Sequence, residues 1–162
     1  MGCSVHCKET GALCGNWDVG LACAWTNGLL AAFAENPAMK MDDAIKMCSQ
    51  VHYDALNMDD VLKPFIGRPE AFCGYLNEKW HWIVTMDPDG KRIIADENKA
   101  ECVCPLIRAG AAATPNLCKC SEGFAERMFE KVFEKKVRAR VVESVLRGGS
   151  HCVYEIVADE SR

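Results

Sequence analysis

The chain has 162 residues, of which 19 are basic and 23 acidic, giving a formal charge of −4. This length favours one domain, or one domain with an appended subdomain, that buries a substantial core. The acidic balance argues against a nucleic-acid-binding protein, which needs a basic face, and the longest apolar run near the start, 29–34, is too short to span a membrane. The N-terminus lacks the basic and apolar regions of a secretory signal, so we expect a cytoplasmic protein.

The first 77 residues are predicted to form a helical N-terminal part. Residues 16–35 are apolar at helical spacing and stop before an Asn-Pro pair, which is typical of a helix end. The same spacing returns over 41–52, where Cys48 falls on the apolar face. Shorter helices are expected at 58–65 and 69–77.

From Trp80 the apolar period changes to two, which indicates β-strands. A first hairpin is predicted over 80–95, with Pro88 and Gly90 in its turn, and a second over 136–157. A helix capped by Ser121 is predicted between them, at 121–134. The fold class is therefore α+β: residues 78–162 form an antiparallel sheet of two hairpins with a helix, and residues 1–77 pack on it to complete one compact domain.

The most unusual feature is the cysteine content, which is 11 of 162 residues. The stretch 101–124 holds two Cys-x-Cys pairs, Cys102 with Cys104 and Cys118 with Cys120. In a reducing compartment such a pattern favours metal ligation or reactive thiols over disulfides. Three interpretations stay open at this point: a metal or cofactor site, a redox or reactive thiol pair, and inert core cysteines. We favour metal.

The order of several features resembles a known superfamily. These features are Cys104-Pro105, then Cys118 or Cys120 with Gly123, then a strand running from Glu143 through Gly149 to Cys152 and Tyr154. Over about residues 78–158 this order resembles the 4-vinyl reductase domain superfamily, and within it the L-2-amino-thiazoline-4-carboxylic acid hydrolase-like proteins. The resemblance implies an α+β domain that binds a small hydrophobic molecule and holds zinc through cysteine and glutamate.

Carried over by position, the resemblance implies a ligand set for this chain. Cys152 matches the final cysteine and Glu143 the acidic residue, whereas Leu146 stands where relatives have a further cysteine. Four thiolates would close the site and make the zinc structural. An iron–sulfur cluster is the less favoured alternative. We predict Cys104, Cys118, Cys120 and Cys152 as the metal ligands, with Cys102, Glu143 and His151 as secondary candidates.

Two functions from different classes follow from these features. The first is a zinc-stabilised domain that binds a small, largely apolar molecule, with Trp80 and Trp82 lining the ligand pocket. The alternative is a hydrolase of a small cyclic C–N bond that uses a cysteine or a metal-bound water. We also expect that the protein can self-associate as a homodimer. Cys48 and Cys73 are expected in the core, and the role of Cys3, His6, Cys7 and Cys14 is left open.

Overall fold

The structure, a computed structural model, describes residues 26, 29, 35, 38, 41–108 and 114–159. The predicted helix at 16–35 lies almost entirely outside the described residues, as do Cys3, His6, Cys7 and Cys14. Contacts divide the chain into two units: Met1–Met41 with Val103–Thr114, and Asp42–Cys102 with Pro115–Arg162. Of the first unit, the structure describes one regular element, the short helix α5 (Pro105–Arg108), besides a few single residues. The second unit contains every other element below.

The second unit is built on a four-stranded antiparallel sheet. Its strand order is β1-β2-β4-β3, so the chain forms two hairpins whose inner strands pair with each other. This confirms the predicted α+β fold. The strands are β1 (Ile83–Met86), β2 (Arg92–Asp96), β3 (Val137–Glu143) and β4 (Val153–Ala158).

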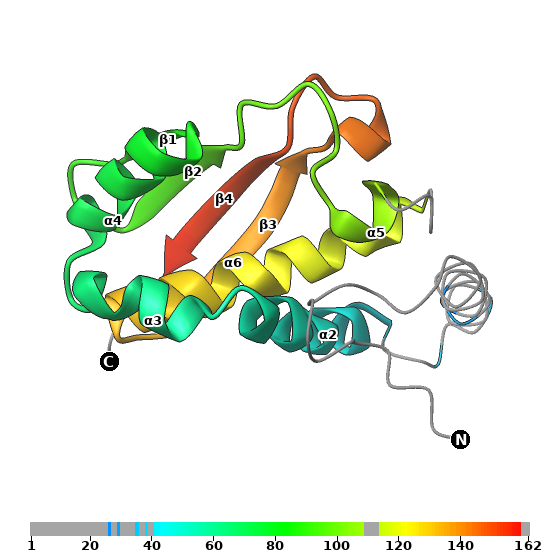
Figure 1. Ribbon diagram of the computed structural model, residues 1–162, viewed down its shortest axis with the longest axis horizontal. Helices are drawn as coiled ribbons and strands as arrows, with labels where there is room; N and C mark the ends of the chain where they lie inside the picture. Colours follow the sequence, from blue (N-terminus) through cyan, green and yellow to red (C-terminus); the bar gives the residue numbers. More distant parts are fainter. Residues whose placement is uncertain are drawn as a thin grey trace, which may run out of the picture. The chain divides into compact units, whose positions relative to one another are not determined.

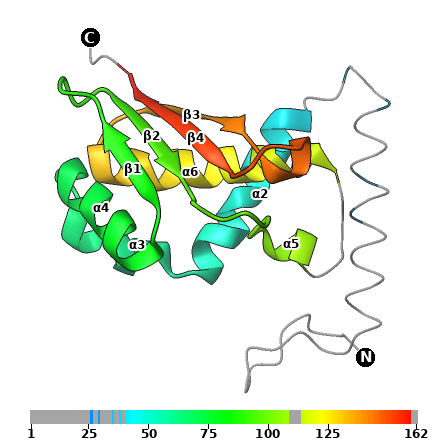
Figure 2. The same ribbon diagram turned by 90° about the horizontal axis from the view of Figure 1, so that it is seen from above.

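One long helix covers one face of the sheet. In Figure 1, α6 lies between the strands and the helices α2 and α3, and Figure 2 shows it crossing behind the strands. The helices of the second unit are α2 (Met41–Ala55, whose first residue belongs to the other unit), α3 (Met58–Leu62), α4 (Pro69–Tyr75) and α6 (Cys118–Phe133). The remaining turns are the 3-10 segments Lys63–Phe65, Pro115–Leu117 and Val145–Arg147 and the π-helix Leu76–Trp80.

The core lies between α6 and the sheet. Side chains of α6 four residues apart, Phe124, Met128 and Val132, are buried and form an apolar stripe along the helix. On β3 the burial alternates: Ala139 and its neighbours at 137 and 141 are buried, whereas Arg138 and the other intervening side chains are exposed. This alternation is typical of a sheet with one face on the core and one face in water.

Helix α2 approaches α6 closely, and this contact corrects one expectation. A Cβ atom at Gly123 would lie 2.7 Å from the carbonyl oxygen of Lys46 and 2.7 Å from Ser49 Oγ, so only glycine permits this crossing. The buried face of α2 therefore runs through Ile45, Ser49 and Tyr53. Cys48 lies beside this face and is exposed, so its predicted core position was wrong.

Three predicted element boundaries also differ from the structure. Trp80 ends a π-helix and His81 has a positive φ of 59°, so β1 begins only at Ile83 rather than at Trp80. Helix α6 begins at Cys118, three residues before the predicted cap Ser121. The sequence pattern predicts a strand over 136–146, but β3 ends at Glu143. Ser144 then caps a 3-10 turn, accepting a hydrogen bond from the Leu146 amide.

None of the helices in the described part of the chain is both long enough and apolar enough to span a membrane.

Candidate functional site: a buried thiol centre

Three cysteines from separate segments of the second unit lie near enough for the charges of Cys102 and Cys118 to act on Cys152. Cys118 is the first residue of α6, Cys152 directly precedes β4, and Cys102 lies in the irregular stretch after β2. Glu97, which follows β2, donates its backbone N–H to the carbonyl oxygen of Cys152 at 3.0 Å, so the β2–β4 pairing continues to this point. We call Cys102, Cys118, Cys152, Glu97 and Tyr154 the thiol centre.

The centre contains a buried carboxyl–phenol pair. Tyr154 donates a hydrogen bond of 2.7 Å from its hydroxyl to Glu97 Oε1, and the two residues are only 5% and 6% exposed. Burial raises the pKa of the Glu97 carboxyl, although the bond from Tyr154 opposes this change. Burial, followed by the charge of Glu97, raises the pKa of Tyr154 well above its ordinary value. The surroundings therefore favour the protonated form of both groups.

The thiol of Cys152 is also held in its protonated form. Burial raises the pKa of Cys152 to about 11, and the negative charges that Glu97, Cys102 and Cys118 would carry act in the same direction. A hydrogen bond with the backbone of Val145 opposes the increase. Because the thiolate is the reactive form of cysteine, Cys152 is a weak nucleophile at neutral pH in this environment.

Cys118 is fixed by a contact with the turn after β3. Its Sγ lies 3.2 Å from the hydroxyl oxygen of Ser144, in a contact that is buried. Ser144 is itself only 1% exposed and accepts a hydrogen bond from the Leu146 amide at 3.1 Å. The first turn of α6 and the 3-10 turn are thereby joined beside Cys152.

The other two predicted cysteine ligands are placed differently. Cys118 and Cys120 both belong to α6, and a separation of two residues turns a helix by about 200°. The two thiols therefore point to different sides while this turn stays helical. Cys104 belongs to the first unit, where its carbonyl oxygen accepts the Arg108 amide of α5 at 3.0 Å.

The secondary candidates have different partners: Glu143 binds the loop between β3 and β4, and the His151 side chain binds Asp96 at the end of β2. Glu143 Oε1 accepts the backbone amides of Ser150 at 2.7 Å and His151 at 3.4 Å. A Cβ atom at Gly149 would lie 2.5 Å from Glu143 Cγ, which explains the glycine there. The His151 ring contacts Asp96, with 3.0 Å between Nδ1 and Oδ2. As placed, both side chains order the loop that leads to Cys152.

The two predicted pocket residues join an aromatic row that ends at the centre. The Trp80 and Trp82 rings meet edge to face with centroids 5.3 Å apart, although the backbone there is not a strand. Trp82 stacks on Tyr154 with centroids 6.0 Å apart, and Trp80 meets Tyr75 edge to face. Both tryptophans are half-buried against the core. A ligand pocket at these rings stays a prediction.

Sequence reasoning missed Glu97, which is the carboxylic acid of the centre. Glu97 stands in the polar stretch Asp96–Asn98 after a strand, where an acid normally faces water. Its burial depends on Tyr154, 57 residues away, and no local pattern marks it. Within 42–108 and 114–159, no group of three or more His, Cys, Asp or Glu side chains is arranged so that it could hold a metal ion as it stands.

Comparisons with known proteins give a family match over part of the chain. The model of a family of unknown function (DUF6144) matches residues 92–162, less than half of the chain. No curated protein matches. One similar solved structure is a trafficking protein particle complex subunit 3 from Naegleria fowleri covalently bound to palmitic acid. It has 10% identity and a TM-score of 0.45, covering 90% of this chain and 98% of that chain.

A second similar structure is an H-NOX protein from S. oneidensis in the Fe(II)NO ligation state. It has 18% identity and a TM-score of 0.45, covering 81% of this chain and 72% of that chain. Neither similarity is high enough to assign a family or a function. The α+β fold implied by the 4-vinyl reductase resemblance is therefore confirmed by the strands and helices themselves, and membership of that superfamily stays a prediction.

Proposed function

We propose that this chain is a small metal-binding domain in which cysteines of the thiol centre bind a zinc ion, and that the domain binds a small, largely apolar molecule. The observation that carries the proposal is the backbone hydrogen bond that places the buried Glu97 beside Cys152, together with the effect of the Cys102 and Cys118 charges on the Cys152 thiol. Thiolates and carboxylates are typical zinc ligands, and structural sites use four of them.

The electrostatics of the centre support a cation. Glu97, Tyr154 and the cysteines can each become negatively charged, and the negative charge of one disfavours that of the next. A bound divalent cation reverses this effect, because it stabilises the anionic form of every ligand around it. When bound, zinc would supply fixed cross-links between three distant segments, and with four ligands it would keep no open position for chemistry.

The proposed ligand set modifies the one predicted from the sequence. Cys118 and Cys152 are retained, and Cys102 takes the place of Cys120, which the helical geometry of α6 turns away from Cys118. Binding requires the thiols to come closer than they lie in the structure, since no described group is arranged for a metal. Cys102 is the ligand that can move most readily, because it belongs to no helix or strand. Glu97 is the candidate for the fourth position.

The aromatic row supports the ligand-binding part of the proposal. Trp82 presents an apolar ring stacked on Tyr154, whose hydroxyl bonds Glu97. A small apolar molecule with a single polar group matches this combination of ring faces and one buried acid. The hydrolase alternative receives less support, because the high pKa of the Cys152 thiol disfavours the nucleophilic thiolate.

The metal is tested by purifying the protein without oxygen and measuring zinc and iron per chain. We expect about one zinc per chain. Cys102→Ser, Cys118→Ser and Cys152→Ser should each lower the zinc content, and the matched control Cys48→Ser, at an exposed position on α2, should not. Replacing zinc by cobalt should give thiolate-to-metal absorption bands that the three variants weaken. Wild-type protein without metal, or full zinc in all three variants, would contradict the proposal.

The ligand is tested with the apolar dye 1-anilinonaphthalene-8-sulfonate, by following energy transfer from tryptophan to the bound dye. Trp82→Phe should reduce the transfer more than Trp80→Phe, because Trp82 is the ring in contact with Tyr154. Equal transfer in wild type and both variants would show that the dye binds elsewhere.

A further inference from the structure

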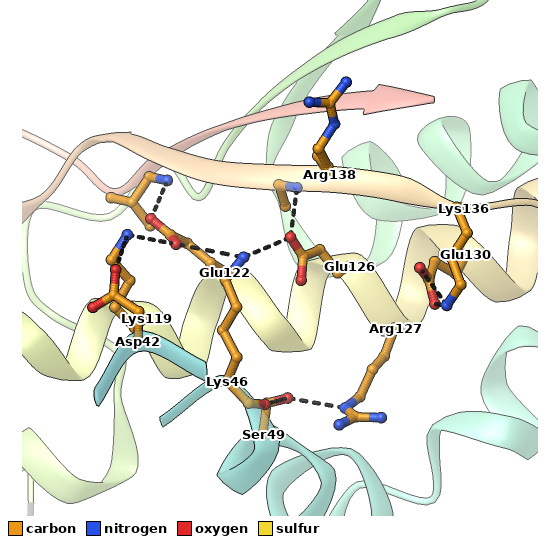
Figure 3. A network of polar contacts seen from close by, with 12 residues as sticks. Asp42, Lys46, Ser49, Lys119, Glu122, Glu126, Arg127, Glu130, Lys136 and Arg138 are labelled. Carbon is orange, nitrogen blue, oxygen red and sulfur yellow. Dashed lines mark hydrogen bonds and ion pairs between the residues drawn. The ribbon is translucent and has the colours of Figure 1, made fainter. Parts of the chain in front are cut away.

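A second polar cluster lies along the edge strand β3. Because β3 is the last strand of the sheet, the amides on its outer edge have no strand partner. Two of them are bound by side chains of α6: Ala139 donates to Glu126 Oε1 at 3.1 Å, and Val141 donates to Glu122 Oε1 at 3.1 Å. We call Glu122 and Glu126 the edge carboxylates; Figure 3 shows them beneath β3.

The spacing of the edge carboxylates matches the strand. Four residues of a helix advance by about 6 Å, and two residues of an antiparallel strand advance by about 6.8 Å. A pair of glutamates one turn apart can therefore reach two successive outward amides, as Glu122 and Glu126 do. Each carboxylate thereby takes the place that a carbonyl oxygen of a neighbouring strand would occupy.

Two lysines hold the edge carboxylates in position. Lys46 of α2 lies 2.7 Å from Glu126 Oε1, and Lys119 lies 3.0 Å from Glu122 Oε2. Glu122 is only 3% exposed, so its charge needs these partners. Figure 3 shows both ammonium groups directed at the carboxylates, whereas Arg138 points away from them.

The other edge of the sheet is covered in a similar way. The side chain of Asn77 accepts the Val84 amide at 2.7 Å and donates to the Val84 carbonyl oxygen at 3.3 Å. Asn77 therefore pairs with β1 as one residue of a neighbouring strand would. Both edges of the described sheet thus carry side chains at positions where another strand would pair.

A groove of about 460 Å³ follows the β3 edge, and the edge carboxylates and both lysines line it. On its outer side are Arg138 and Arg140, whose charges are matched by Asp159 and Glu155 of the same unit. The charges on this side are therefore balanced within the chain. The edge carboxylates occupy two amide pairing positions of the strand, and Arg147 Nη1 donates to the carbonyl oxygen of Val141 at 3.4 Å.

We propose that the edge carboxylates close β3 to strand addition, and that the strand they exclude is β3 of a second copy of this chain. An unpaired edge strand is a template for a further strand. Antiparallel pairing of two identical strands satisfies the unpaired backbone N–H and C=O groups of both strands. With seven residues, β3 is the longest described strand. The role of Glu122 and Glu126 is then to keep the protein from associating through this edge.

The test compares the double variant E122A/E126A with wild type by sedimentation velocity over a range of protein concentrations. Removing both carboxylates exposes the amides of Ala139 and Val141, and self-association should become at least about tenfold tighter. The matched control is E130A, since Glu130 lies one turn further along α6 and pairs with Lys136 rather than with a strand amide. The control should associate no more than wild type.

A third substitution separates strand pairing from general aggregation. Proline has no N–H, so A139P in the double variant removes one pairing position and should return the association to the wild-type level. If E122A/E126A does not fold, E122Q/E126Q keeps the side-chain volume, loses the ion pairs with both lysines and should show a smaller increase. A folded double variant that associates like wild type would overturn the proposal, and so would association that A139P leaves unchanged.

Discussion

Two buried carboxyl groups of this protein have opposite surroundings. Glu97 is 6% exposed and Glu122 is 3% exposed. Glu122 contacts a backbone amide and two ammonium groups, of Lys119 at 3.0 Å and Lys46 at 3.9 Å. Burial, followed by the nearby charge of Asp96, raises the pKa of Glu97, and the hydrogen bond from the Tyr154 hydroxyl and the charge of Lys99 only partly oppose this increase.

The difference indicates two roles for buried acids in one small fold. A carboxylate whose charge is matched by nearby donors and cations serves the structure, as Glu122 does at the β3 edge. In the metal-free protein, the charged form of a buried acid is poorly stabilised when its neighbours can also become negatively charged. Such a group is a candidate for a functional site, where a cation or a polar ligand supplies the missing positive charge or hydrogen bond.

The largest effect is expected at the helix crossing that brings Lys46 to the edge carboxylates. Gly123→Ala places a Cβ atom 2.7 Å from the Lys46 carbonyl oxygen, so α2 must shift. We expect a loss of about 2 to 3 kcal/mol in the free energy of unfolding, measured with urea. The control Gly74→Ala meets no atom within 4 Å in helix α4 and should not destabilise the protein. Equal stability of the two variants would show that α2 does not pack as described.

Substitution of the two buried acids should give the next largest effect on stability. Glu122→Gln removes a charge that two lysines match, and we expect a loss of about 1 to 2 kcal/mol. Glu97→Gln replaces a group whose protonated form is already favoured, and the metal-free protein should stay within about 0.5 kcal/mol of wild type. Urea unfolding of both variants at neutral pH with a chelator measures the contrast. A larger loss of stability for Glu97→Gln than for Glu122→Gln would contradict this prediction.

Alkaline pH should destabilise the metal-free protein through its buried thiols. The pKa of Cys152 is raised from 9.0 to about 11, so the folded state binds more protons than the unfolded state between these values. The stabilisation is therefore complete below pH 9 and is lost as the pH rises through about 11. Cys73 has the same raised pKa of about 11 through burial in the core. Cys152→Ala should reduce the slope of unfolding free energy against pH in this window and leave the part due to Cys73.

The smallest effect is expected on the outer face of the sheet. Arg140 and Arg92 lower the pKa of Glu155, so this group stabilises the fold above its ordinary pKa and the stabilisation is lost as the pH falls through the lowered value. Both arginines are exposed, and Glu155→Gln should cost less than about 1 kcal/mol at neutral pH. The stability of this variant should also fall less on acidification. A loss of stability as large as that of Glu122→Gln would contradict this prediction and show that the ion pairs of the outer face contribute substantially to folding.

The sequence determined the fold class, because local periodicity marks helices and strands. The period-two pattern located both hairpins, and the helix between them and the core position of Cys73 were predicted correctly. Local patterns failed where two structures satisfy them equally. The alternating Trp80 and Trp82 fit a strand, but a π-helix and a left-handed His81 also bring both rings to the same aromatic row.

Only the tertiary structure decided which polar groups meet. The Glu97–Tyr154 bond spans 57 residues and the Cys118–Ser144 contact spans 26, so no spacing along the chain predicts either. The same holds for Cys48, whose exposure follows from the glycine contact between α2 and α6. Periodicity fixes which side chains share a face of an element, whereas close packing between elements fixes where that face points. The cysteine metal site therefore stays a prediction, and the neighbours of each cysteine depended on the packing of α6 against the sheet.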